Sequence, residues 1–171
     1  FKNIKFYNNN LMIHYIFDLD DTIIIHKNQV NYNWIYEDKE LIHYLNKCEG
    51  SKYIYTNGTS GHALTVLQKM GLIDIFEKIY SRDTIDYMKP DHKSAYDVHD
   101  DISIRDTQPK VIFFFDDRLE NLKMGSQFGW YTIWIHPKYT TKSDYNYVNL
   151  AFPNIKEALS YLEKKYKKFN I

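Results

Sequence analysis

The fold is decided by the stretch Ile13-His14-Tyr15-Ile16-Phe17-Asp18-Leu19-Asp20-Asp21-Thr22. Its first half is β-prone and bulky on both faces, which is typical of a strand buried on two sides in a parallel sheet. The strand then ends in Asp18 and Asp20, and open α/β sheets bind their ligands at this carboxyl edge. Two carboxylates so close together need a cation, a proton or a chemical role, because like charges repel.

Strand-like and helix-like segments alternate along the rest of the chain. Further strands are expected at residues 52–56, 78–81, 111–115 and 131–135, and helices at 37–48, 62–70, from 91, at 120–128 and from 155. Residues 23–36 are expected to form a short hairpin or flap. This alternation predicts an α/β fold, with a doubly wound, parallel, five-stranded Rossmann-like sheet and helices on both faces. We expect a single domain over residues 1–171, with residues 1–11 either inside it or extending beyond its core.

The composition narrows the class of protein. The chain has 171 residues, 44% of them hydrophobic and 17% aromatic, which suffices for one sizeable core and argues against disorder. Lys plus Arg and Asp plus Glu balance at 22 each, so no overall field draws the chain to nucleic acid or to a membrane. The single cysteine, Cys48, excludes an internal disulfide and favours a reducing, cytoplasmic compartment. No apolar run approaches the roughly 20 residues that cross a bilayer, and residues 1–11 lack the features of a signal peptide.

Polar residues also follow the other predicted strands. Thr56-Asn57-Gly58 ends the second strand, Lys89 precedes a helix, and Asp116-Asp117 ends the fourth strand. In a right-handed parallel sheet the carboxyl ends of all strands lie on one edge, so these groups can converge. Carboxylates about 4 Å apart repel by roughly 4 kcal/mol at an effective dielectric near 20, so such a cluster needs a cation. A set of oxygen ligands with room for water suits Mg²⁺.

Mg²⁺, a lysine, a hydroxyl and backbone amides together make a receptor for a phosphate group. A carboxylate facing that phosphate can attack it, and a second acid two residues on can protonate the leaving oxygen and later deprotonate water. Each element alone has a structural explanation: Asp-Asp pairs often cap helices, Thr-Asn-Gly is often a turn, and single lysines are usually exposed. Their occurrence together and in order points to chemistry.

The four segments together resemble the four motifs of the haloacid dehalogenase (HAD) superfamily, over roughly residues 13–136. They are Asp18-Leu19-Asp20-Asp21-Thr22, Thr56-Asn57-Gly58, Lys89-Pro90 and Asp116-Asp117-Arg118-Leu119-Glu120-Asn121. The resemblance implies that Asp18 is the nucleophile and a Mg²⁺ ligand, and that Asp20 is the general acid/base and lends its backbone carbonyl to the metal.

The other motifs receive roles from the same resemblance. Thr56, with Asn57 and Gly58, is expected to bind the phosphoryl oxygens, and Lys89 to neutralise the aspartyl-phosphate site. Asp116 and Asp117 are expected to complete the Mg²⁺ shell, with Asp117 favoured as the direct ligand. An acid at position 20 favours a phosphatase over a dehalogenase, because dehalogenases of the superfamily lack it.

The substrate is less sharply defined. Thr56-Asn57-Gly58 with His62-Ala63 and Met70-Gly71-Leu72 resembles the pyrimidine 5′-nucleotidase branch. Phe114-Phe115-Asp116-Asp117 fits that branch and, equally well, the small magnesium-dependent phosphatases. Residues 23–51 leave no room for the helical cap of the nucleotidases, so we expect a capless core with at most a minimal flap. A small phosphomonoester such as a nucleotide monophosphate is slightly preferred. The alternatives are a phosphotyrosine protein or nucleic-acid end, phosphotransfer to another acceptor, and a catalytically silent binding module.

Trp34 and Arg82 are the main candidates to contact the substrate beyond its phosphate, together with His26, Tyr32 and Tyr36. Aromatic side chains could stack on a base, although anchoring of the flap to the core is the alternative role. Five other histidines show no metal-ligand spacing and are interpreted as surface or packing residues: His43, His62, His92, His99 and His136.

Overall fold

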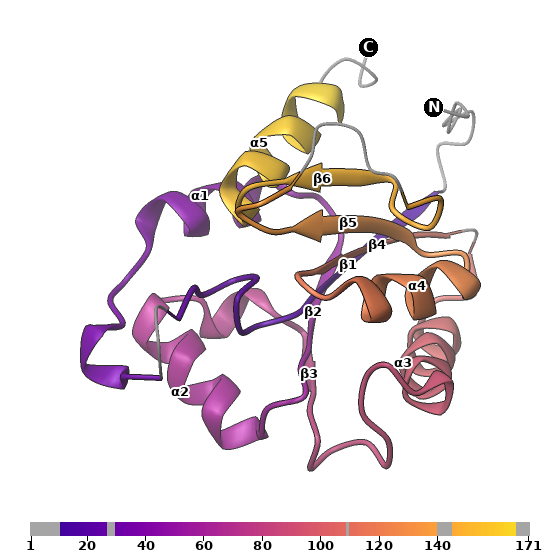
Figure 1. The fold of residues 1–171 in the computed structure, drawn as a ribbon, viewed down its shortest axis with the longest axis horizontal. Helices are drawn as coiled ribbons and strands as arrows, with labels where there is room; N and C mark the ends of the chain where they lie inside the picture. Colours follow the sequence, from indigo (N-terminus) through magenta and orange to yellow (C-terminus); the bar gives the residue numbers. More distant parts are fainter. Residues whose placement is uncertain (1–10, 27–29, 109, 140–144, 167–171) are drawn as a thin grey trace.

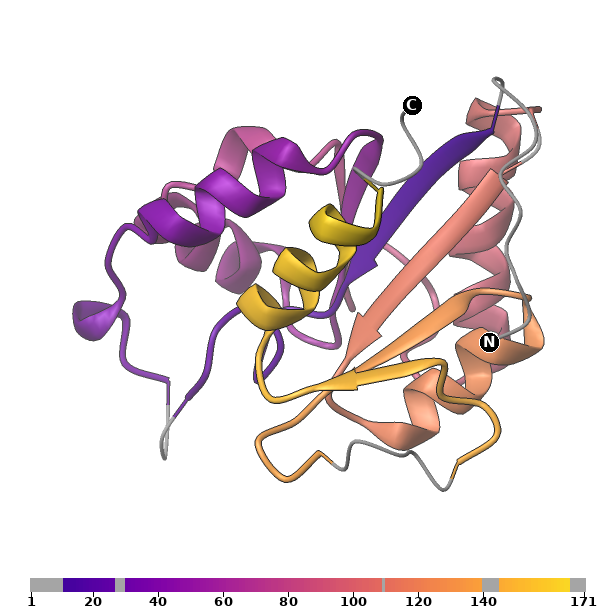
Figure 2. The same cartoon turned by 90° about the horizontal axis from the view of Figure 1, so that it is seen from above.

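The computed structural model describes residues 11–26, 30–108, 110–139 and 145–166, which form one parallel sheet with helices on both faces (Figures 1 and 2). The strands are β1 (Met12–Phe17), β2 (Ser51–Tyr55), β3 (Lys78–Tyr80), β4 (Lys110–Asp116), β5 (Tyr131–Ile135) and β6 (Leu150–Phe152). The helices are α1 (Lys39–Lys47), α2 (Ser60–Met70), α3 (His92–Arg105), α4 (Leu119–Gln127) and α5 (Ile155–Tyr166). In this part of the chain, no helix combines the length and the apolar character needed to cross a bilayer.

The strands lie in the order β3-β2-β1-β4-β5-β6, and every neighbouring pair is parallel. The predicted doubly wound Rossmann-like fold is therefore confirmed, with six strands instead of five. Strand β6 is not predicted from the sequence, because its three residues are all half-buried and too few to show a period. Strands β2 and β3 lie on one side of β1, and β4, β5 and β6 lie on its other side, so the order of the strands reverses between β1 and β4. At such a point, α/β sheets bind ligands outside the carboxyl ends of the strands.

Alternate residues of the strands supply two separate cores, one on each face of the sheet. Tyr15 and Phe17 of β1 pack in the core that contains the apolar faces of α1, α2 and α5. Ile16, which lies between them, packs in the core that contains those of α3 and α4. The two views show the same division, with β1 and β4 in the middle (Figures 1 and 2). The two central strands are thus covered on both faces and form a rigid frame for the residues that follow them.

The ends of α2 and α3 depend on local capping. Gly71 ends α2 with a φ of 72°, and the Leu72 N–H donates to the Leu67 carbonyl over 2.8 Å, which is a Schellman motif. Helix α3 begins at His92, one residue later than the sequence predicts, because Asp91 is the cap and accepts the Lys93 N–H. Lys89 therefore lies in the loop before α3.

The predicted hairpin between residues 23 and 36 is absent from the described residues of that segment. Asp20 and Ile24 form one isolated bridge, and Tyr32–Trp34 form a turn of 3₁₀ helix. We call the described residues 23–26 and 30–36 the flap. Helix α1 follows it and belongs to the core, so the described part of residues 18–50 contains no separate cap domain.

The contact between α4 and the sheet predicts a difference between two helical glycines. A Cβ at Gly125 would lie 2.7 Å from Phe114 Cδ1, whereas a Cβ at Gly61 would meet nothing within 4 Å. We expect Gly125→Ala to lower the free energy of unfolding by about 1–3 kcal/mol through overpacking. Gly61→Ala should raise it by up to about 1 kcal/mol, because alanine is the better helix former. Urea denaturation measures both, and equal stabilities would contradict the close packing of α4.

Candidate active site

A buried lysine joins carboxylates from the two central strands. Lys89 Nζ donates to Asp18 Oδ1 and to Asp116 Oδ2, each over 2.7 Å. Asp18 directly follows β1, and its N–H donates to the Phe115 carbonyl of β4 over 2.9 Å. The side chains of Asp18, Lys89 and Asp116 are all buried. The strand order thus brings Lys89 onto two acids that lie 71 and 27 residues away in the sequence.

A cavity of about 190 Å³ opens beside this buried group, at the carboxyl edge of the sheet. All four of the sequence segments singled out above contribute to its wall. The lining residues are Asp18, Asp20, Asp21, Asn57, Gly58, Lys89, Asp117, Arg118 and Asn121.

The two acids at the end of β4, Asp116 and Asp117, have different surroundings. Asp116 is fully buried, and Asn121 Nδ2 donates to both of its oxygens over 3.0 and 3.1 Å. The Arg118 N–H also donates to Asp116 Oδ1. Asp117 is half-buried and lines the cavity. Asp116 is therefore held by the protein, whereas Asp117 faces the space that a ligand would enter.

The negative charge at this edge exceeds what Lys89 neutralises. Burial raises the pKa of Asp18 to about 7, because the loss of water outweighs the opposing Lys89 ammonium, and Asp116 adds repulsion. Burial also raises the pKa of Asp117 to about 6, helped by the charges of Asp116 and Asp21. Burial alone would lower the pKa of Lys89, but Asp116 and Asp18 together raise it above its ordinary value. The lysine is therefore charged, and the carboxylates still favour a further cation.

The donor set fits Mg²⁺. Asp18, Asp116 and Asp117 each place an oxygen within 4.8 Å of the other two. Asn121 Oδ1 is buried beside them and has no hydrogen-bond partner among the described residues. It could therefore accept a hydrogen bond from a water molecule in the hydration shell of an ion. An oxygen-only cluster next to a cavity with room for water is the environment that Mg²⁺ selects.

The side chain of Asn57 fixes the loop after β2 to the backbone of Lys89. Asn57 Nδ2 donates to the Lys89 carbonyl over 2.8 Å, and Asn57 Oδ1 accepts the Lys89 N–H over 2.9 Å. Thr56 Oγ1 accepts the Gly58 N–H over 2.9 Å, and a hydroxyl that accepts can still donate its own proton. A Cβ at Gly58 would lie 3.2 Å from Thr56 Oγ1 and 3.6 Å from Asp20 Oδ2. The glycine therefore keeps the space between the hydroxyl and the carboxylate open.

Asp20 is held by two histidines. Its Oδ1 lies 2.7 Å from His26 Nε2 and 2.8 Å from His62 Nε2. Tyr32 OH in turn lies 2.8 Å from His62 Nδ1. The interpretation of His62 as a surface or packing residue is therefore wrong. The signal that could have identified it is its position, since the first turn of a helix that follows Thr56-Asn57-Gly58 must begin at the same edge of the sheet.

Arg82 holds the loop after β2 and is absent from the cavity wall. Its Nε donates to the Asn57 carbonyl over 2.8 Å, and its N–H donates to the Gly58 carbonyl over 3.1 Å. The structure thus places Arg82 behind the phosphate-binding loop that the sequence predicts. Its predicted contact with the substrate stays a prediction.

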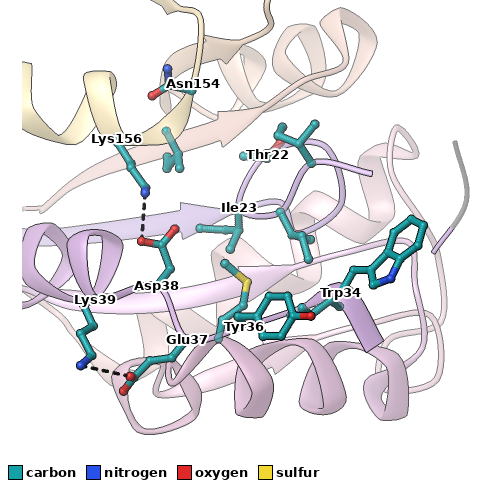
Figure 3. A pocket seen from close by; sticks show the side chains of 14 residues that line it. Thr22, Ile23, Trp34, Tyr36, Glu37, Asp38, Lys39, Asn154 and Lys156 are labelled. Carbon is teal, nitrogen blue, oxygen red and sulfur yellow. Dashed lines mark ion pairs between the residues drawn. The ribbon is translucent and has the colours of Figure 1, made fainter. Parts of the chain in front are cut away.

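Trp34 lies in a second hollow, a groove of about 800 Å³ between the flap and the start of α5 (Figure 3). Its side chain is 76% exposed. Figure 3 shows Trp34 at one end of the groove and the ion pair between Lys156 and Asp38, 2.9 Å long, at the other. Thr22 lines the groove and also donates to Asp18 Oδ2 over 3.1 Å, so the two hollows share a wall.

A family model described as haloacid dehalogenase-like hydrolase matches residues 24–135. This range begins after Asp18 and Asp20 and includes Thr56, Lys89 and Asp116. No curated protein matches the chain.

Solved structures share the fold at low sequence identity. YfnB of Bacillus subtilis, named as a HAD hydrolase and described as bound to magnesium, is 16% identical with a TM-score of 0.64 over 95% of this chain and 100% of its own. The core domain of a Streptococcus pneumoniae protein named as a phosphoglycolate phosphatase is 16% identical, with a TM-score of 0.60 over 92% of this chain and 98% of its own. L-2-haloacid dehalogenase from Xanthobacter autotrophicus is 13% identical, with a TM-score of 0.59 over 77% of this chain. This chain spans 62% of the dehalogenase.

At these low identities the structural likeness shows the fold alone, and the names of these proteins state different reactions. The family model covers more than half of the chain, including three of the four segments that meet at the cavity. The chain therefore belongs to the haloacid dehalogenase-like hydrolases.

Proposed function

We propose that the protein is a Mg²⁺-dependent phosphomonoesterase that works through an aspartyl-phosphate at Asp18. The observation that carries this proposal is Asp20, a carboxylate on the cavity wall two residues after the nucleophile. An acid here can protonate a leaving oxygen, which phosphate ester cleavage needs and halide release does not. Dehalogenases of the superfamily lack this acid, so Asp20 favours phosphate chemistry.

Each residue of the site has a role in this reaction. The Asp18 carboxylate attacks phosphorus, the ester bond breaks, and the leaving oxygen takes the proton of Asp20. Asp20 then removes a proton from water, which attacks the aspartyl-phosphate and releases phosphate, so that Asp18 ends as a carboxylate and Asp20 again carries its proton. Lys89 fixes the orientation of Asp18 and offsets the negative charge that accumulates beside it.

Asp18, Asp116, Asp117 and the Asp20 carbonyl would hold Mg²⁺. When bound, the ion supplies the positive charge that lets a phosphate dianion approach a carboxylate. The Thr56 hydroxyl and the amides of the following loop offer hydrogen bonds to the remaining phosphoryl oxygens.

The shape of the site favours a substrate whose phosphate alone enters the cavity. Its 190 Å³ suit a phosphoryl group, so the rest of the substrate would lie outside, against the flap. A small phosphomonoester such as a nucleotide monophosphate fits this arrangement. A screen of nucleotides, sugar phosphates, phosphopeptides and phosphorylated nucleic-acid ends tests the choice, and turnover of phosphopeptides without nucleotides would reverse it.

The reaction class is tested by two parallel assays, phosphate release from an aryl phosphate and chloride release from 2-chloropropionate. We expect phosphate release that requires Mg²⁺ and stops with EDTA, and no chloride release. Chloride release alone would replace the proposal with a dehalogenase. Mg²⁺ binding without turnover of any substrate would make the protein a binding module.

Replacing the general acid should penalise poor leaving groups selectively. We expect Asp20→Asn to lower kcat by about 10²–10⁴-fold for an alkyl phosphate, whose leaving alkoxide must be protonated. The loss should be much smaller for p-nitrophenyl phosphate, whose leaving group needs no proton. Steady-state kinetics on both substrates measure the difference, with the exposed Asp74→Asn as the matched control. Equal losses on the two substrates would contradict the role of Asp20 as an acid.

A further inference from the structure

The cluster of Asp20, His26 and His62 has the composition of a second metal site, distinct from the oxygen cluster. The Oδ1 of Asp20 and the Nε2 atoms of both histidines all lie within 4.8 Å of one another. Their side chains are 34%, 13% and 14% exposed, so the three groups are sheltered but reachable from solvent. Two imidazoles and one carboxylate suit Zn²⁺, Cu²⁺, Ni²⁺ or Co²⁺, whereas Mg²⁺ prefers oxygen ligands.

The cluster is also built in the way that metal-binding histidines are supported. Tyr32 OH lies 2.8 Å from His62 Nδ1, so the ring can donate its Nδ1–H to the phenol oxygen and turn a free Nε2 toward an ion. His26 is tied by its own backbone, because its N–H donates to Asp21 Oδ1 over 3.1 Å. The His62 ring and the His26 backbone are therefore held by contacts that an ion would leave intact.

The geometry needs only a small opening to admit the ion. The two nitrogens lie 2.7 and 2.8 Å from Asp20 Oδ1. Tetrahedral ligands about 2.0–2.1 Å from Zn²⁺ lie roughly 3.3 Å apart, so each nitrogen would move about 0.5 Å from the oxygen. Three protein ligands leave a fourth position for water, as in zinc sites that are open to solvent.

We propose that Asp20, His26 and His62 bind Zn²⁺ or a similar transition-metal ion, and that this ion inhibits the enzyme. The inhibition rests on the proposed phosphatase function, since an ion bound to Asp20 Oδ1 removes the acid that protonates the leaving group. The oxygen cluster around Asp18 and Asp117 would still hold Mg²⁺. The oxygen cluster thus selects a hard cation such as Mg²⁺, and the cluster of Asp20, His26 and His62 selects a softer one such as Zn²⁺. Only the ion bound in the second cluster inhibits turnover.

Binding is tested without reference to activity. The full chain, saturated with Mg²⁺ to fill the oxygen cluster, is titrated with Co²⁺ while its visible absorption is recorded, and Zn²⁺ is then added to displace the Co²⁺. We expect a single bound Co²⁺ with nitrogen ligation, displaced by Zn²⁺. Losing one of three ligands in His26→Gln or in His62→Gln should weaken Zn²⁺ binding by at least about 10-fold.

Matched variants separate the two clusters. His43→Gln changes an exposed histidine of α1 and should leave Zn²⁺ affinity unchanged. Tyr32→Phe removes the supporting phenol and should weaken binding by roughly 10-fold. Because His26 lies on the flap and His62 on α2, a folding defect in one variant would leave the other to decide. Melting temperatures identify such a defect.

Inhibition is read as the ratio of turnover with and without Zn²⁺ at saturating Mg²⁺, measured for each variant against itself. We expect Zn²⁺ to suppress turnover by the wild-type protein and by His43→Gln, and we expect the concentration for half inhibition to rise at least about 10-fold in both ligand variants.

Zn²⁺ binding that is unchanged in both ligand variants and lost in Asp117→Asn would place the ion in the oxygen cluster and overturn the proposal. Absence of any Co²⁺ or Zn²⁺ binding would leave the histidines as hydrogen-bond partners of Asp20 and would also overturn it. Zn²⁺ binding at these histidines with no turnover of any phosphate ester would refute the proposed function alone.

Discussion

Under the proposed mechanism we expect Asp18→Asn to abolish phosphate release, with a loss of at least about 10⁴-fold in kcat, comparable to the removal of other catalytic nucleophiles. An amide oxygen is far less nucleophilic than the carboxylate, and no other acid follows β1 as the direct continuation of the strand. Hydrolysis of an aryl phosphate at saturating Mg²⁺ measures the effect. Wild-type activity in this variant would exclude the aspartyl-phosphate mechanism.

The same substitution should leave the fold intact, which gives the experiment its control. In EDTA, the pKa of Asp18 is raised by burial to about 7, above the ordinary 3.8, so ionisation of this group costs stability as the pH rises from about 4 to 7. Asp18→Asn removes that cost, and its melting temperature above pH 7 should equal or exceed that of the wild-type protein. A variant that is inactive and less stable would indicate that Asp18 is a structural partner of Lys89.

Lys89→Met has the largest expected effect on stability. It leaves Asp18 and Asp116 buried without their shared cation, and breaking a buried ion pair in this way costs about 3–5 kcal/mol. The matched control is Lys52→Met, another buried lysine, whose ammonium donates to the Cys48 and Gly50 carbonyls. That change leaves neutral acceptors unpaired and should cost about 1–3 kcal/mol.

The pH dependence of this loss identifies its cause. The folded-state pKa of Lys89 is raised above its unfolded value, so its contribution to stability is complete at pH 7 and is lost only as the pH rises through the folded pKa. Without the lysine, protonation of Asp18, whose pKa burial already raises to about 7, relieves its repulsion with Asp116. The stability difference between Lys89→Met and wild type, measured by urea denaturation in EDTA, should therefore shrink from pH 7 to pH 5. A constant difference would point to lost packing of the lysine stem instead.

The parts of the fold and site that the sequence predicts are those set by the strands. Runs such as residues 111–115 can only be interior strands, and a parallel sheet then places the residues after them at one edge. This argument alone brings Asp18, Lys89 and Asp116 close together. The sixth strand escaped prediction because three half-buried residues carry no periodic signal.

The parts that could not be predicted depend on contacts between loops. The bond between His62 and Asp20 joins residues 42 apart, and the start of a helix at this edge of the sheet places His62 near Asp20 without specifying the bond between them. The sequence predicts a short hairpin or flap over residues 23–36, and the apolar residues of this segment face two different surroundings. Ile23 and Ile35 are buried in the core, whereas Trp34 lies open to solvent. The burial of these residues depends on the neighbouring groove, so the segment shows no regular alternation of buried and exposed residues from which a strand could be predicted.

The N–H of Asp18 completes the hydrogen-bond ladder between β1 and β4, whereas Asp20 lies beyond that ladder and is steadied by side chains of the flap and α2. Local opening of the flap can therefore rearrange the proton donor, but displacing the attacking carboxylate requires the middle of the sheet to separate. Under the proposed mechanism, sequence change in the flap can consequently alter which alcohol is released while the bond-forming half of the chemistry is inherited unchanged.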